Sequence, residues 1–96
     1  MPRLIWTPRS RLDLQRLHLV LAPKNPDAAY RALRALRRGL KILEKYPETG
    51  RPVPEYSGEY REWIIEFGQA SYVALYHYKG KQVTILAIRH SREAGY

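Results

Sequence analysis

Cysteine is absent from the 96 residues of this sequence, and long apolar runs are absent as well. Without cysteine the chain can form no disulfide bond, no thiolate nucleophile and no cysteine-ligated zinc site. The longest apolar runs, residues 19–22 and 85–88, are far too short to cross a membrane, and residues 1–6 do not resemble a signal peptide. We therefore expect a cytoplasmic protein that folds as one domain over residues 1–96.

Acidic residues are scarce relative to basic ones. The chain has 17 Lys and Arg but only 9 Asp and Glu, for a formal net charge of +8. Residues 1–50 hold 11 basic and 4 acidic residues, whereas residues 51–96 hold 6 and 5. A field of this sign attracts nucleic acid, anionic lipid or an acidic protein, and it originates mainly in the first half of the chain.

Cofactor motifs are missing too. No glycine-rich phosphate-binding loop occurs, and the three histidines, His18, His77 and His90, lack the spacing of a metal site. The sequence therefore predicts neither a cofactor nor a metal ion. His77 and His90 have the chemistry of general acid–base groups, because histidine titrates near neutral pH, but histidines on strands more often pack or face solvent. His18 fits an ordinary helical position.

The first half of the chain has the periodicity of two helices. Thr7 followed by Pro8 is typical of a helix start, and the leucines that follow recur on one face until residue 21. Residues 25–27 (Asn-Pro-Asp) begin a second helix, whose apolar positions recur every three to four residues until Pro47 ends it. The short break at residues 22–24 predicts that the two helices form an antiparallel hairpin.

The second helix also has a basic face. Its cations recur at helical spacing: Arg31, Arg34, Arg38, Lys41 and Lys45. We interpret this basic stripe as a candidate binding surface for an acidic partner. A row of long cations on a helix can equally be an ordinary solvated face.

The second half changes to the two-residue periodicity of strands. Residues 47–54 are a proline-rich loop, and turns are predicted at residues 68–71 and 79–80. The predicted strands are residues 60–67, 72–78 and 83–89, with a short apolar strand at residues 4–6 ahead of the helices. The last strand is almost entirely apolar, which predicts a central position in the sheet. This order predicts an α+β fold: an N-terminal strand, an antiparallel helical hairpin and a three-stranded antiparallel meander.

Aromatic side chains are concentrated on the predicted strands. They are Trp63, Phe67, Tyr72, Tyr76 and Tyr78. Sheet aromatics can stack on bases in RNA-binding modules. A chain this small has few other large apolar groups, so we predict that these residues form the core or a partner-binding groove.

This order of elements resembles the RelE/ParE family, the toxin halves of bacterial type II toxin–antitoxin pairs. The resemblance lies in residues 5–8 (Ile-Trp-Thr-Pro), 22–29 (Ala-Pro-Lys-Asn-Pro-Asp-Ala-Ala), 46–52 (Tyr-Pro-Glu-Thr-Gly-Arg-Pro) and 88–93 (Ile-Arg-His-Ser-Arg-Glu). Each segment is weakly specific alone, but their joint occurrence in a basic chain of this length is much more specific. The resemblance implies a toxin neutralised by an acidic, ParD-like antitoxin, with operator DNA bound only through the toxin–antitoxin complex.

The family has two kinds of target. RelE-like members cut mRNA on the ribosome, using basic residues and a tyrosine on the sheet, whereas ParE-like members poison DNA gyrase. Where RelE-like nucleases carry strand lysines, this chain has Ile64, Ile65 and Glu66. Where they carry an arginine after the tyrosine matched by Tyr72, it has Val73. RNA cleavage needs a base, an acid and cations, which these residues do not supply.

The resemblance therefore favours a ParE-like inhibitor of DNA gyrase that has no catalytic residues. A ribosome-dependent mRNA endoribonuclease is the alternative. A basic nucleic-acid-binding domain without toxicity is a third hypothesis, which predicts strong, salt-dependent DNA binding by the chain alone.

The tail after the last strand is the candidate target-binding segment. It holds Arg89, His90, Arg92 and Tyr96. Arg92 matches a basic position of RelE-like nucleases. Tyr96 lies near the position of their tyrosine, but its spacing from the neighbouring residues differs. The resemblance implies that this region of ParE-like toxins matters for action on gyrase. We expect the fold to end near Ile88, with the tail beyond it either an interaction motif or a frayed end.

Overall fold

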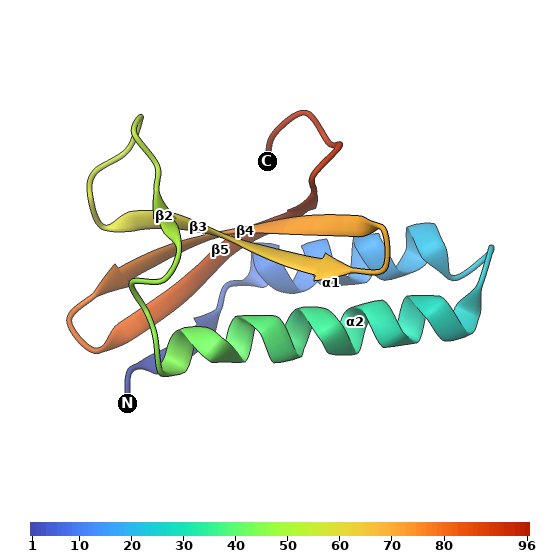
Figure 1. The fold of residues 1–96 in the computed structure, drawn as a ribbon, viewed down its shortest axis with the longest axis horizontal. Coiled ribbons are helices and arrows are strands. Elements are labelled where there is room, and N and C mark those ends of the chain that lie inside the picture. The colour runs from blue at the N-terminus through green and yellow to red at the C-terminus, as the bar shows by residue number, and fades with distance from the viewer.

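A helical hairpin lies against one face of a five-stranded sheet in the computed structural model, which describes residues 1–96 (Figure 1). The elements are β1 (Arg3–Trp6), α1 (Pro8–Leu21), α2 (Pro26–Lys41), a 3₁₀ turn (Ile42–Glu44), β2 (Arg51–Pro52), β3 (Tyr60–Phe67), β4 (Ala70–Lys79) and β5 (Gln82–His90). The predicted α+β fold with an N-terminal strand, a helical hairpin and an antiparallel meander is confirmed. Neither helix combines the length and the apolar content that crossing a membrane requires.

Both helices begin where their capping residues predict. The Thr7 hydroxyl accepts a hydrogen bond from the Ser10 amide at 3.1 Å, and the Asn25 side chain accepts one from the Ala28 amide at 3.0 Å. In each helix a proline follows the capping residue. The N–H of the first helical residue has no partner within the helix, so a proline, which lacks this N–H, loses no hydrogen bond there. Local sequence signals therefore suffice to define both helix starts.

The sheet has the strand order β1-β5-β4-β3-β2, so β4 is the central strand. The prediction that the last strand is central was wrong by one position. β5 lies between β4 and β1, and β1 pairs with it in parallel. An apolar strand is needed at either position, because both are flanked by strands on two sides.

Two predicted connections are shorter than expected. Residues 68–71 were expected to be a turn, but Ala70 pairs with Phe67, which leaves a two-residue turn that starts at Gly68 with a φ of 60°. Glycine adopts a positive φ with little strain because it has no Cβ, whereas other residues are strained there. The loop at residues 47–54 is also not entirely irregular, since Arg51 and Pro52 form β2 and pair with Glu62 and Arg61 of β3.

The core lies between the hairpin and the sheet. It contains leucines of α1 and α2, the inward side chains of β4 and β5, and Ile65 of β3. Tyr72 and Tyr76 are 2% and 0% exposed, whereas Trp63, Phe67 and Tyr78 are partly buried and pack against the same cluster. The strand aromatics were predicted to form the core or a partner-binding groove, and the core is confirmed for Tyr72 and Tyr76, with the other three packed against it.

Polar contacts join α1 to β5 where the β4–β5 ladder is irregular, beside Leu75 and Tyr76. The Asp13 carboxylate, on an otherwise buried helix face, accepts a hydrogen bond from the Ile88 amide at 2.9 Å. The Thr7 hydroxyl donates to the Ile85 carbonyl at 2.8 Å. These contacts tie β5 to the start of the helical layer at and beyond its last pairing with β1, between Trp6 and Ile85, and they position the strand from which the C-terminal tail starts.

Candidate functional site

The C-terminal tail is more ordered than the sequence predicts. β5 does not end near Ile88: Arg89 pairs with Val73 and His90 pairs with Tyr72. The expected boundary was wrong because the pairing of β5 with β4 continues past the last apolar residue, Ile88, onto Val73 and Tyr72. The tail proper therefore begins at Ser91.

Glu93 closes a turn at the start of the tail. Its carboxylate accepts a hydrogen bond from the His90 amide at 2.7 Å and forms an ion pair with Arg16 of α1 at 2.6 Å. Burial acts to raise the pKa of Glu93, but the amide of His90 and the charge of Arg16 outweigh it and lower the pKa. The turn is thus tied both to its own strand and to the helical layer.

The rest of the tail bends over the face of the sheet that points away from the helices (Figure 1). There the Tyr96 hydroxyl donates to the Glu62 carboxylate at 2.6 Å, and the Arg89 guanidinium lies 5.2 Å from the centre of the Tyr96 ring. Arg51 binds the other Glu62 oxygen at 3.0 Å. We call this group, Arg51, Glu62, Arg89 and Tyr96, the tail clasp.

The tail clasp changes the protonation chemistry of its tyrosine. Burial raises the pKa of Tyr96, and the hydrogen bond to Glu62 and the negative charge of Glu62 raise it further. Arg89 acts in the opposite direction but does not outweigh these effects. Tyr96 is therefore a neutral hydrogen-bond donor near neutral pH, suited to holding a position and not to abstracting a proton.

The four predicted target-binding residues do not form one site. Arg89 and Tyr96 meet in the tail clasp, whereas the His90 ring packs edge-on against Tyr72 with 5.3 Å between ring centres. The Arg92 amide donates to His90 Nδ1 at 3.0 Å. His90 and Arg92 line a separate cavity of about 400 Å³ together with residues of α1. Successive strand residues face opposite sides of a sheet, which separates Arg89 from His90.

Sequence reasoning missed Glu62, Glu93 and Asp13, the acids that organise these contacts. Asp13 could have been found, because it is an acid at helical spacing with the buried leucines of α1. No local pattern marks Glu62, since it becomes important only when a residue 34 positions later folds onto it.

The outer face of the sheet has few free cations. Register places Glu62, Ile64 and Glu66 of β3 on this face beside Leu75, Val73 and Ser71 of β4. Ile64 is 45% exposed, whereas Val73 is 4% exposed. Tyr72 points into the core, where burial raises the pKa of its hydroxyl. A phosphate approaching the β3 side of this face would meet carboxylates and apolar side chains, and the two cations of the face, Arg51 and Arg89, are engaged in the tail clasp.

An acid–base pair lies at the end of β4. His77 Nε2 is 3.1 Å from the Glu59 carboxylate, whose pKa is lowered chiefly by this hydrogen bond. The Tyr60 and His77 rings lie 4.8 Å apart, and Lys79 is 3.6 Å from the same carboxylate.

No group of three His, Asp or Glu side chains is placed to bind a metal ion.

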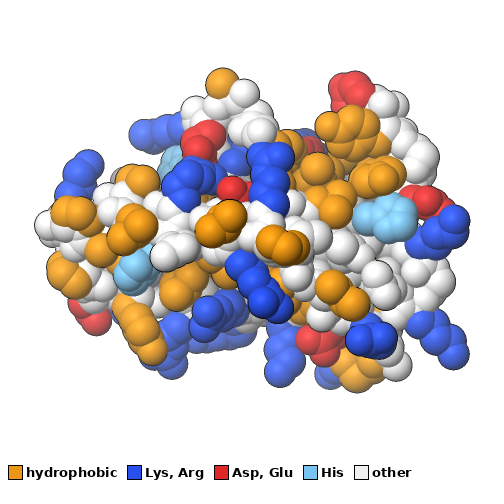
Figure 2. Space-filling view, turned by 180° about the vertical axis from the view of Figure 1, so that it is seen from behind, with side chains coloured by type: hydrophobic (Ala, Val, Ile, Leu, Met, Phe, Trp, Pro, Cys, Tyr) orange, Lys and Arg blue, Asp and Glu red, His pale blue; other side chains and the backbone are white.

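The basic stripe is exposed along its whole length (Arg31, Arg34, Arg38, Lys41 and Lys45). Arg31 pairs with Asp27 at 3.1 Å, and Arg34 lies 6.0 Å from the centre of the Tyr30 ring. The other three cations form no ion pair. Figure 2 shows Lys and Arg side chains along its lower half, over the helical layer.

Comparisons with known proteins agree with this architecture. A family model for the ParE toxin of the type II toxin–antitoxin system parDE matches residues 4–95. Two toxins of Caulobacter vibrioides are similar: Toxin RelE3 is 35% identical over 90% of each chain, and Toxin RelE1 is 35% identical over 88% of each chain. A solved chain from the chromosomal ParDE TA system of P. aeruginosa is 25% identical, with a TM-score of 0.77 over 94% of this chain and 96% of that one. The chain therefore belongs to the RelE/ParE family of type II toxin–antitoxin toxins.

Proposed function

We propose that this toxin is a ParE-like poison of DNA gyrase, neutralised by an acidic, ParD-like antitoxin. One observation carries the choice of target: the outer face of the sheet presents Glu62, Ile64 and Glu66 where cleavage of RNA would require cations. A phosphorane intermediate carries extra negative charge and needs preorganised positive groups around it. Carboxylates at that place would destabilise it.

The tail clasp supports a binding role for the tail. Its residues are fixed by hydrogen bonds and by the packing of Arg89 over Tyr96, so the tail reaches a target already ordered. A segment that is ordered before binding loses less conformational entropy when it binds. The tail residues Arg92 and Tyr96 then contact gyrase, with Arg89 and His90 holding the strand end beneath them.

The basic stripe is the surface that attracts the antitoxin during association. An acidic segment is attracted to a row of exposed cations, which speeds association and makes it sensitive to salt. We further propose that the toxin contacts operator DNA only as part of the toxin–antitoxin complex.

Purified gyrase provides the test. With supercoiled plasmid, gyrase and ATP, the toxin should trap DNA cleaved by gyrase, which appears as linear plasmid after denaturation. Tyr96→Phe should lower the yield of linear DNA several-fold, because the hydroxyl that holds the tail is lost. Tyr30→Phe is the matched control, since that exposed ring on α2 lies outside the clasp and should leave the yield unchanged. No linear DNA with the wild-type toxin would reject gyrase as the target.

Cleavage of mRNA on the ribosome is the second candidate, because His77 and Glu59 form a hydrogen-bonded acid–base pair beside Tyr60. The similar Caulobacter proteins carry RelE in their names. Primer extension on mRNA after induction separates the two functions. Cuts in phase with the reading frame, lost in His77→Gln, would support the nuclease, whereas uncut mRNA with an SOS response would support the gyrase poison.

A further inference from the structure

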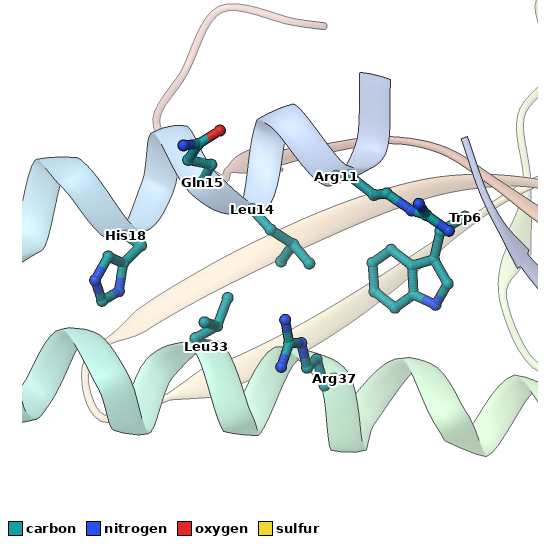
Figure 3. A pocket seen from close by; sticks show the side chains of 7 residues that line it. All are labelled: Trp6, Arg11, Leu14, Gln15, His18, Leu33 and Arg37. Carbon is teal, nitrogen blue, oxygen red and sulfur yellow. The ribbon is translucent and has the colours of Figure 1, made fainter. Parts of the chain in front are cut away.

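Two hollows of similar size lie on opposite sides of the sheet, and they differ in chemistry. The hollow between α1 and α2 has a volume of about 450 Å³, and Arg11 and Arg37 are among the residues that line it (Figure 3). The hollow on the outer face of the sheet has a volume of about 420 Å³ and no charged side chain in its lining, although the chain has a net charge of +8. We call the second one the tyrosine hollow, after its lining residues, which are Tyr56, Ser57, Tyr60 and Leu75.

The tyrosine hollow lies beside the tail clasp. The loop between β2 and β3 and the C-terminal tail both stand above the face of the sheet that points away from the helices (Figure 1). Leu75 of the central strand forms the floor of the hollow and pairs in register with Glu62, whose carboxylate binds Tyr96 of the tail. A partner held in the hollow is therefore within reach of the tail, so the two form one continuous surface.

The tyrosine rings are held in place before anything binds. Backbone hydrogen bonds close their loop: the Tyr56 amide donates to the Val53 carbonyl at 3.0 Å, and the Tyr60 amide donates to the Ser57 carbonyl at 3.0 Å. The two rings lie 5.5 Å apart at 71° to each other, and Tyr60 also packs on His77. Tyr56 is nevertheless 52% exposed. A fixed, exposed tyrosine loses little entropy on binding, and tyrosines are enriched among the residues that dominate binding energies.

The hydroxyls of the hollow are free for a partner. Among the eight tyrosines, only Tyr76 and Tyr96 use their hydroxyls in hydrogen bonds within the protein. The hydroxyls of Tyr56 and Tyr60 can therefore donate to the backbone carbonyls of a bound segment. With the two ring faces and Leu75 as apolar surface, the hollow suits an apolar side chain that has polar backbone groups on either side of it.

The charges around the tyrosine hollow select its occupant. Nucleic acid is bound chiefly through its phosphates, by lysine and arginine side chains. None lines the hollow, and the cations nearby already bind acids: Arg51 pairs with Glu62 at 3.0 Å, and Lys79 pairs with Glu59 at 3.6 Å. An acidic protein segment would find no unpaired cation there for the same reason. The chemistry therefore favours a protein segment without net negative charge.

We propose that the tyrosine hollow anchors an uncharged, apolar side chain of the gyrase protein, and this inference rests on the proposed function. The side chain packs between the rings of Tyr56 and Tyr60 and on Leu75, and the two hydroxyls donate to backbone carbonyls beside it. The tail contacts the same partner next to the hollow. The toxin thus binds the protein part of its target, and it does so without DNA.

Binding of the full toxin to purified gyrase in the absence of DNA tests this proposal, alongside the yield of linear plasmid. Tyr56→Ala should raise the Kd for gyrase at least about tenfold, as the loss of a central tyrosine predicts, and should lower the yield of linear DNA in parallel. Tyr56→Phe keeps the ring and should lose only a few-fold. Tyr30→Ala is the matched control, because it removes another exposed tyrosine ring, from α2, and it should change the Kd by less than about twofold.

Ser57→Lys gives a second readout that removes no part of the fold. It places a cation at the edge of the hollow, where an uncharged apolar side chain gains nothing from it, so binding to gyrase should weaken several-fold. If the occupant were nucleic acid or an acidic segment, the same lysine would strengthen binding. Circular dichroism melting of each variant accompanies the assay. All should melt close to the wild type, because Tyr56 is half exposed and backbone hydrogen bonds close its loop.

The outcomes separate the two proposals. If the wild-type toxin traps no cleaved DNA, the proposed function fails. If it traps cleaved DNA, but Tyr56→Ala behaves like Tyr30→Ala, only the proposal for the tyrosine hollow is overturned. Binding to gyrase that requires DNA, or that Ser57→Lys strengthens, overturns it as well. An equal loss of antitoxin binding in Tyr56→Ala would assign the hollow to the antitoxin and also overturn it.

Discussion

The hydroxyl of Tyr96 is the atom on which the order of the tail depends, and Tyr96→Phe removes it while leaving the ring. The hydroxyl donates to Glu62 at 2.6 Å, and the ring lies under the Arg89 guanidinium at 5.2 Å. Phenylalanine keeps the ring contact with Arg89. The substitution therefore isolates the hydrogen bond from the packing of the tail.

The size of the effect follows from the exposure of the two partners. A hydrogen bond to a charged group contributes about 1.5–3 kcal/mol to stability when both partners are buried. The Glu62 side chain is only 14% exposed, but Tyr96 is 38% exposed, so solvent weakens the contact. We expect a coupling free energy between Tyr96 and Glu62 of about 1 kcal/mol, below the lower end of that range.

A double-mutant cycle measures this coupling. Urea unfolding is recorded for the wild type, Tyr96→Phe, Glu62→Gln and the double variant. Glu62→Gln alone should destabilise more than Tyr96→Phe, because it also weakens the pairing with Arg51. The cycle removes that additional loss, since Arg51 is present in all four proteins. A coupling below about 0.3 kcal/mol, within the error of additivity, would refute the tail clasp.

The same contact predicts a response to alkaline pH. The folded state raises the pKa of Tyr96, so the group binds its proton more tightly in the folded protein than in the unfolded one. Its contribution to stability is complete below the ordinary tyrosine pKa of about 10 and is lost as the pH rises toward the raised value. Tyr96→Phe should lack this part of the alkaline loss of stability. An identical pH profile for the two proteins would contradict the assignment.

Three further predictions concern the scaffold and the turn that starts the tail. Asp13→Ala should lower the free energy of unfolding by about 2–3 kcal/mol, because it leaves a buried amide of β5 without an acceptor, and Asp13→Asn should lose less. Gly50→Ala should destabilise by about 1–3 kcal/mol, because a Cβ there would lie 2.6 Å from the Tyr76 hydroxyl, whereas Gly58→Ala meets no atom within 4 Å and should be neutral in urea unfolding. The lowered pKa of Glu93 predicts a contribution present above the ordinary glutamate pKa and lost as the pH falls through the lowered value, and Glu93→Gln should remove that part of the acid transition.

Local signals in the sequence were enough for the helices and for most of the strands. Thr7 and Asn25 cap the helices through hydrogen bonds within three residues, and such contacts depend on no distant part of the chain. The alternation along residues 60–67 likewise follows from one buried face. The errors lay in the connections: β4 starts at Ala70 and β5 continues to His90, because each strand extends as far as its neighbour supplies backbone partners.

The sequence by itself determined the helical hairpin, the strand content, the basic first half and, through the order of its motifs, the family. All of these depend on periodicity, capping and composition, which are properties of neighbouring residues. Tertiary structure alone decided that β1 joins β5 in parallel and that Tyr96 meets Glu62. Those contacts join residues far apart in the chain, and their geometry is set only when the hairpin packs on the sheet, because that packing fixes which side chains come within reach of one another.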